Sequence, residues 1–257
     1  MRLAGELTAL GADLPDHRER WGRLSQTGVA VCPVLDGVVL AETPWEALAG
    51  GRTKGIELLV GHTRDEFRLF SVMMGRLGTF TEDDARTALD LFAPTPDGAD
   101  AYRAAYPRAT PEDLLEVVYS DALFRMPSLR LAQANQAAGG TSFLFELRLA
   151  ATEAGGVLGA CHSLDVPLAF GTLDSPVGRH LFGDRPTPAV TAVSRELRRG
   201  WVRFATTGAP GWPAHRPERQ LTRVLDIESR TVPYPEAASR RIWEHHDPAP
   251  FDVARTT

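Results

Sequence analysis

The chain has 257 residues, 43% of them hydrophobic and 24% charged, which is the composition of a globular protein with a buried core. Its formal net charge of -5 and its pI of about 5.8 disfavour nucleic-acid and anionic-membrane partners, because both need a concentrated positive surface. The cysteines, Cys32 and Cys161, are too few for a disulfide framework, and no uninterrupted apolar segment could cross a bilayer. We therefore expect a soluble, cytoplasmic protein with a small-molecule ligand, unless a preceding segment carries a leader.

The first predicted elements are a hairpin, a short helix and a strand. Residues 28–39 contain apolar segments on both sides of Asp-Gly, a dipeptide that favours a tight turn between antiparallel strands. Pro44 is predicted to begin a helix that ends before the adjacent glycines at 50 and 51. Residues 56–61 are mostly apolar, which is typical of a strand buried on both faces of a parallel sheet.

The middle of the chain is predicted to be helical. Residues 81–138 have helical periods of apolar side chains, interrupted by several prolines, and this pattern indicates a helical insertion made of several pieces. The apolar positions of these periods are Leu89, Phe92, Leu114, Val117, Val118 and Leu129. Residues 142–147 then form a second candidate for a buried strand, before a glycine-rich loop that contains His162.

A long amphipathic helix and a closing hairpin are expected near the C-terminus. Val190, Val193 and Leu197 recur at helical spacing, while several arginines fall on other faces of the same helix. This pattern favours a core-packed helix with a solvated arginine face over a helix that binds nucleic acid. Residues 221–232 are predicted to form a strand or a hairpin.

Two titratable loops follow the two buried strands. In open α/β sheets, ligands and catalytic groups collect beyond the carboxyl ends of the strands, where Glu66 and His162 are expected. Taken alone, Glu66 also fits a capping box with Thr63, and His162 fits an ordinary hydrogen-bonded loop histidine. Cys161 as a thiol nucleophile is disfavoured because the adjacent His162 would point away from it. The histidines show no metal-ligand spacing, and no cofactor is expected.

Five short segments carry a resemblance to a known family. They are PVLDG at 33–37, LVGHTRDE at 59–66, SDALFRMP at 120–127, GACHSLDVPLAFG at 159–171 and WVRFATTG at 201–208. In this order they resemble the C-terminal half of type-B carboxylesterases, the α/β-hydrolase family that includes para-nitrobenzyl esterases and cholinesterases. Each segment is modest alone, but the five in family order are specific; an unrelated small globular domain would have to match them by chance.

The resemblance implies a fold and roles for particular residues. It implies an α/β fold in which residues 1–257 form a single partial α/β-hydrolase domain: the last parallel strands, a helical insertion at about 81–138, a C-terminal helix and a hairpin. It implies that Glu66 is the acid of a catalytic triad, that His162 is the general base, and that Asp165 supports the histidine loop. A small carboxylic ester is the implied substrate. Phe70, Phe80, Phe124 and Phe170 are candidates for a substrate pocket, although ordinary core packing is the better interpretation of each.

The nucleophile of such a triad is missing from the sequence. No serine lies in Gly-x-Ser-x-Gly, and Ser142, the nearest approximation, lies in a predicted strand. A His-Gly-Gly-Gly-like segment for an oxyanion hole is also absent. We therefore expect a truncated or split esterase that is inactive alone and has a possible N-terminal esterase half as its partner. The alternative is a non-catalytic, esterase-like binding module, as in neuroligins, which keep the fold without the serine.

Overall fold

A computed structural model describes residues 10, 13–27 and 31–246. The chain divides into two compact units, of which one comprises Met1–Pro44 with Asp247–Thr257 and the other comprises Trp45–His246. In the part that the model describes, no helix combines the length and the apolar character needed to cross a membrane. The prediction of a single domain over 1–257 stays a prediction.

The smaller unit contains short helices and an irregular segment. Its helical turns are η1 (Leu14–His17), α2 (Arg18–Trp21) and η2 (Gly22–Gln26). The predicted hairpin at 28–39 is wrong wherever it can be judged: residues 28–30 lie outside the described residues, and residues 31–40 form no strand. Asp36 explains the difference, because its Oδ1 accepts hydrogen bonds from the amides of Val38, Val39 and Leu40 at 2.9, 2.8 and 3.0 Å. These local bonds use the donors that a strand ladder would need.

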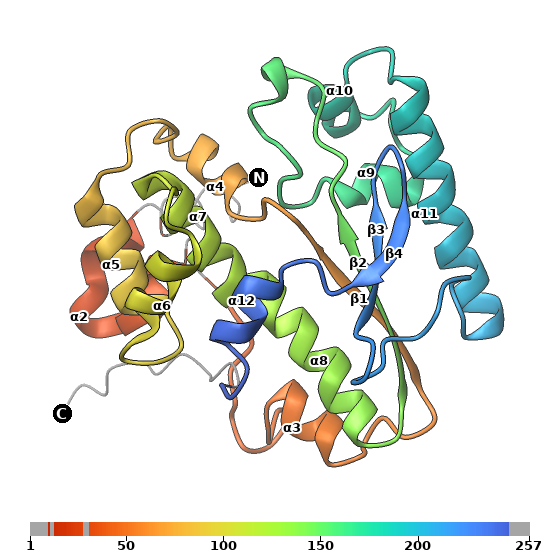
Figure 1. The fold of residues 1–257 in the computed structure, drawn as a ribbon, viewed down its shortest axis with the longest axis horizontal. Coiled ribbons are helices and arrows are strands. Elements are labelled where there is room, and N and C mark those ends of the chain that lie inside the picture. The colour runs from red at the N-terminus through yellow and green to blue at the C-terminus, as the bar shows by residue number, and fades with distance from the viewer. Residues whose placement is uncertain (1–9, 11–12, 28–30, 247–257) are drawn as a thin grey trace. The chain divides into compact units, whose positions relative to one another are not determined.

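The larger unit contains a mixed four-stranded sheet with the order β1-β2-β3-β4 (Figure 1). Strands β1 (Glu57–Thr63), β2 (Thr141–Leu147) and β3 (Leu221–Leu225) are parallel, and β4 (Arg230–Pro233) closes an antiparallel hairpin with β3. The two predicted parallel strands and the closing hairpin are therefore confirmed. Burial is confirmed for β2 but not for β1, whose residues 57–61 are exposed or half-buried. Helix α3 (Pro44–Ala49) begins at the proline, as predicted.

Strand β2 is covered on both faces, which explains its almost continuous apolar sequence. On one face, the ring of Phe145 lies 4.9 Å from the ring of Trp201 on helix α11 (Pro188–Thr207). On the other face, Ser142 Oγ accepts a hydrogen bond of 3.0 Å from Asn135 on helix α8 (Met126–Ala137). Burial of β2 between these helices fixes the position where the strand ends, and with it the position of the loop that follows.

Helices occupy most of the segment between β1 and β2. They are α4 (Arg68–Met73), α5 (Glu82–Phe92), α6 (Gly98–Ala105), α7 (Pro111–Ser120), a π-helical turn η3 (Asp121–Arg125) and α8. Figure 1 shows α5, α6 and α7 grouped together beside the sheet, while α8 runs from this group along β1 and β2. Of the six apolar positions predicted for this region, five are buried and Val117 is half-buried. The helical character of residues 81–138 is confirmed.

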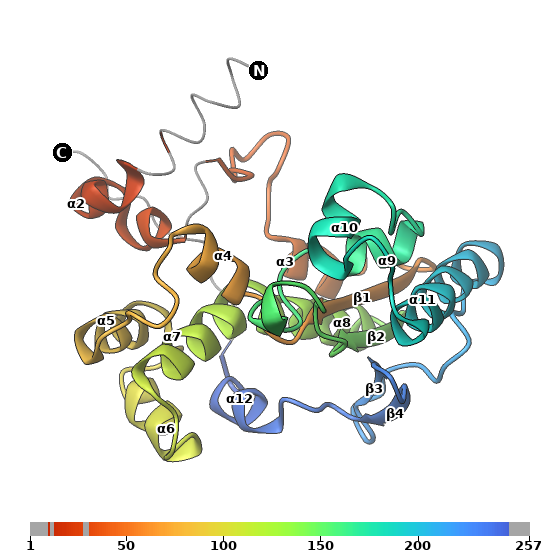
Figure 2. The same cartoon turned by 90° about the horizontal axis from the view of Figure 1, so that it is seen from above.

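The remaining helices follow β2 and β4. They are η4 (Ala154–Gly156), α9 (Asp165–Phe170), α10 (Pro176–Phe182), α11 and α12 (Ala237–Ile242). Figure 2 shows α9 and α10 on one side of β1 and β2, and α12 on the other side. Helix α11 buries Val190, Val193 and Leu197 and exposes its arginines, as the amphipathic pattern predicted.

Candidate active site

The structure brings Glu66 and His162 together, although they are 96 residues apart in sequence. Glu66 lies in the turn between β1 and α4, and His162 lies in the loop between β2 and α9. The distance between His162 Nδ1 and Glu66 Oε2 is 2.6 Å, which is that of a short, charge-assisted hydrogen bond. Because the carboxylate only accepts, Nδ1 carries the donated proton.

Glu66 has a second partner that fixes its orientation. Its Oε1 accepts a hydrogen bond of 2.7 Å from the amide of Thr63, and the residue is 4% exposed. The capping-box interpretation is therefore half correct. The hydroxyl of Thr63 has no hydrogen-bond partner among the described residues, and helix α4 begins only at Arg68, so Thr63 does not cap that helix. Glu66 thus uses one oxygen for its own turn and the other for His162.

His162 is packed on aromatic rings and is partly open to solvent. Its ring lies 5.4 Å from that of Phe70 and 4.8 Å from that of Phe124, and its side chain is 36% exposed. The hydrogen bond to Glu66 raises the pKa of His162, against the opposing effect of burial. Within the described residues, Nε2 has no hydrogen-bond partner. The ring therefore presents a basic nitrogen that is free to accept a proton.

The other aromatic candidates lie in different surroundings. Phe80 packs under the guanidinium of Arg76 at 4.6 Å, and Phe170 is 77% exposed. Only Phe70 and Phe124, of the four phenylalanines that the sequence suggested, contact the imidazole ring.

Asp165 acts on His162 through its charge. It is the first residue of α9, and its charge contributes to the raised pKa of His162. Burial, followed by the nearby charge of Glu66, raises the pKa of Asp165 itself. The backbone amides of Asp165 and Val166, at the start of its own helix, oppose this rise in pKa. Support of the histidine loop by Asp165 stays a prediction.

Cys161 does not have the properties of a nucleophile. Its side chain is buried, and burial raises the pKa of its thiol to about 11. At neutral pH the reactive thiolate is therefore scarce. This result agrees with the sequence-based argument against a thiol nucleophile.

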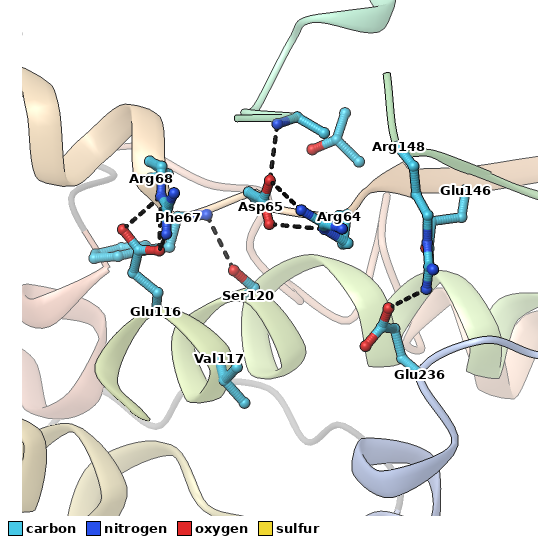
Figure 3. A network of polar contacts seen from close by, with 12 residues as sticks. Arg64, Asp65, Phe67, Arg68, Glu116, Val117, Ser120, Glu146, Arg148 and Glu236 are labelled. Carbon is cyan, nitrogen blue, oxygen red and sulfur yellow. Dashed lines mark hydrogen bonds and ion pairs between the residues drawn. The ribbon is translucent and has the colours of Figure 1, made fainter. Parts of the chain in front are cut away.

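A buried network of charges behind the site was not predicted from the sequence. Arg125 and Asp121 form an ion pair of 2.9 Å, and Arg125 also faces Glu236 at 3.5 Å. Arg148 joins Glu236 at 2.8 Å and contacts Glu146, and Figure 3 shows these three residues together. The segment SDALFRMP contained the signal, since its aspartate and arginine are four residues apart, but their partners come from distant segments.

The same network reaches β1, the strand that precedes Glu66. Nε2 of His62 in β1 lies 3.9 Å from Oε2 of Glu146 in β2. The same nitrogen is hydrogen-bonded to the hydroxyl of Tyr234 at 3.2 Å. Burial lowers the pKa of His62 to about 4 and raises that of Glu146 to about 7. His62 immediately precedes Thr63, whose amide holds Glu66, so the buried network supports the strand end from which the site begins.

Two surface hollows lie away from the acid–base pair. One, of about 500 Å³, follows the arginines of α11, and the other, of about 310 Å³, lies between α8, α12 and the loop before β3. Glu66 and His162 line neither of them.

The sheet, its covering helices and the pairing of Glu66 with His162 define part of an α/β-hydrolase. Comparison with solved structures agrees: a carboxylesterase of Geobacillus stearothermophilus, EST55, superposes with a TM-score of 0.72 at 29% identity. That match covers 84% of this chain and 46% of the esterase. A para-nitrobenzyl esterase structure matches with a TM-score of 0.69 at 28% identity, over 84% of this chain and 44% of that one.

The sequence profile of the "Carboxylesterase family" matches residues 11–236, and the chain belongs to this family. The para-nitrobenzyl esterase of Bacillus subtilis (strain 168) is 30% identical over 215 residues, which are 81% of this chain and 42% of that protein. The fumonisin B1 esterase of Sphingopyxis macrogoltabida is 29% identical over 223 residues, covering 83% of this chain and 39% of the relative. The chain thus spans less than half the length of these relatives and represents a part of the complete fold.

Proposed function

We propose that this chain is the part of a carboxylic-ester hydrolase that supplies the acid, Glu66, and the general base, His162. The hydrogen bond of 2.6 Å between His162 Nδ1 and Glu66 Oε2 carries this proposal. It leaves Nε2 as the proton acceptor of the pair. Membership of the carboxylesterase family, and relatives that are named esterases, support an ester as the substrate class.

The proposed chemistry follows from the two side chains. Nε2 of His162 takes the proton from a serine hydroxyl as that oxygen attacks the ester carbonyl, and later returns it to the leaving alcohol. Glu66 holds the ring in the required tautomer and stabilises the imidazolium that forms. The short hydrogen bond and the raised pKa of His162 support both roles.

In this proposal, the serine comes from a separate segment, the N-terminal half of the esterase. The sequence has no Gly-x-Ser-x-Gly, and the relatives have more than half of their length outside the matched region. Triad enzymes that lose one member retain about 10³ to 10⁴ of rate enhancement over water, through the oxyanion hole and substrate binding. Without a predicted oxyanion segment, this chain alone should lack even that residual activity.

Complementation tests the proposal. The chain is co-expressed with an N-terminal esterase segment that carries Gly-x-Ser-x-Gly, and the mixture is treated with a fluorophosphonate and assayed with a para-nitrophenyl ester. We expect labelling and turnover that require both parts and that disappear with His162→Ala. His180→Ala, which changes an exposed histidine on α10, is the matched control and should keep full activity.

Other outcomes of this experiment would change the assignment. Serine-dependent turnover by the chain alone would contradict the proposed need for a partner. A stable complex in which His162→Ala has no effect on labelling or turnover would remove the proposed base. A stable complex without any labelling would instead favour the non-catalytic, esterase-like binding module.

A further inference from the structure

Asp65 joins the two loops of the site through a pair of hydrogen bonds to one residue. Its amide donates to the carbonyl oxygen of Ala160 at 2.9 Å, and its Oδ2 accepts from the amide of Ala160 at 2.8 Å. Asp65 immediately precedes Glu66, and Ala160 lies two residues before His162. Figure 3 shows the carboxylate of Asp65 directed at this backbone nitrogen and at Arg64. The two loops therefore meet at the residues next to the acid and the base.

The turn that carries Asp65 is itself fixed on both sides. The amide of Arg64 donates to the carbonyl of Leu147, the last residue of β2, at 3.0 Å. The amide of Phe67 donates to Ser120 Oγ at the end of α7 at 3.1 Å. Asp65 thus extends from a turn that β2 and α7 hold in place, and its hydrogen bonds to Ala160 join the histidine loop to this turn.

The histidine loop is fitted to the carboxylate of Asp65. Gly159 has a φ of +56°, in the left-handed region that favours glycine, and a Cβ atom at this position would collide with Oδ2 of Asp65. The carbonyl of Gly159 accepts from the amide of Ala151 at 2.8 Å, which holds the glycine in place. Glycine is therefore required here both by its backbone conformation and by the approach of Asp65.

Asp65 acts on His162 through the backbone and not through its charge. The charges that shift the pKa of His162 are those of Glu66 and Asp165. The negative charge of Asp65 instead strengthens its bond to the amide of Ala160, and it is balanced by Arg64 Nε at 3.1 Å from Oδ1.

We propose that Asp65 is a positioning residue, which holds Ala160 and thereby places His162 within hydrogen-bond distance of Glu66. The inference rests on the proposed role of this pair. It adds a third side chain that never touches the substrate and is needed for the geometry of the other two.

Nuclear magnetic resonance of His162 in the intact chain tests this inference without any need for activity. With Asp65→Ala, we expect the pKa of His162 to fall toward its ordinary value of 6.5 and its Nδ1 proton to exchange with solvent about 10-fold faster or more. Asp65→Asn should retain most of the wild-type behaviour, because the amide oxygen of asparagine still accepts from Ala160. Asp83→Asn, at an exposed carboxylate on α5, is the matched control and should change neither quantity.

Two results would overturn the inference. One is an unchanged pKa and exchange rate of His162 in Asp65→Ala. The other is an equal loss in Asp65→Asn, which would show that charge and not the hydrogen bond is responsible. If Asp65→Ala does not fold, Asp65→Leu decides, because leucine has a similar shape but cannot accept from the amide of Ala160, and it should lower the pKa of His162 in the same way. Failure of complementation would leave these readouts unaffected, so the inference and the proposed function fail separately.

Discussion

Asp121 and Arg125 form a buried ion pair of 2.9 Å across the π-helical turn η3, and neither side chain is more than 4% exposed. A buried pair is weak evidence of net stabilisation, since both charges lose their hydration. Loss of one partner is different, because the remaining charge stays buried without compensation. We therefore expect that loss of either partner destabilises the larger unit.

Arg125→Ala should destabilise the protein by about 3 to 5 kcal/mol. It would leave Asp121 without its cation and would also remove the hydrogen bond of 3.2 Å from Arg125 to the carbonyl of Val117. Urea unfolding followed by circular dichroism measures the change. Arg86→Ala, which breaks exposed contacts to Asp83 and Asp90, is the control and should leave the urea midpoint almost unchanged, because exposed ion pairs contribute little. Equal effects of the two variants would contradict the importance of burial.

Glu66→Gln should weaken the protein most at low pH. The pKa of His162 is raised in the folded state by its bond to Glu66, so this bond contributes stability that is complete below the ordinary pKa of 6.5. The contribution is lost as the pH rises through the folded-state pKa. Urea midpoints of wild type and Glu66→Gln at several pH values should therefore differ most below pH 6.5 and converge at alkaline pH. A difference that grows with pH would reverse the assigned sign.

Glu146→Gln should gain stability relative to wild type as the pH rises. Burial raises the pKa of Glu146 from 4.5 to about 7, so the folded protein holds its proton more tightly than the unfolded chain. Wild type consequently loses stability between pH 4.5 and 7, on the order of 3 kcal/mol, while the neutral amide does not titrate. Chemical unfolding of both proteins at pH 5 and pH 8 measures this relative gain. A constant difference across this range would show that Glu146 titrates normally.

Cys161 should resist alkylation in the folded protein, whereas Cys32 should react. Cys161 is buried with a thiol pKa of about 11, and Cys32 is exposed, so the second cysteine is an internal control. Peptide mapping after iodoacetamide treatment at pH 7.5 should find modification of Cys32 about 100-fold faster or more. Modification of both residues at similar rates would indicate that the loop of His162 opens readily.

The sequence predicted those features that depend on local pattern. Strands β1 and β2 were recognisable as short, mostly apolar segments next to turn residues, although only β2 is buried along its length. Helix α11 was recognisable because its apolar face repeats over many turns. The hairpin at 28–39 was wrong because the periodic pattern did not reveal that Asp36 would bond to the following amides.

The site was predictable to the extent that its residues lie in family motifs. Glu66 and His162 were expected together, but the sequence presented the capping bond and the bond to His162 as rival interpretations of Glu66. The structure shows both, since a carboxylate has two oxygens and each has its own partner. The bridge from Asp65 to Ala160 and the ion network around Arg125 were missed, because they join segments that no local period relates.

The two oxygens of the Glu66 carboxylate have different partners, which bears on how the proposed esterase would be assembled. Thr63, Glu66 and His162 complete their mutual contacts within one polypeptide. The proposed acid–base pair is therefore held in place by contacts within this chain alone. In the proposed enzyme, a serine-bearing segment would then need to align only its own hydroxyl with Nε2 of His162.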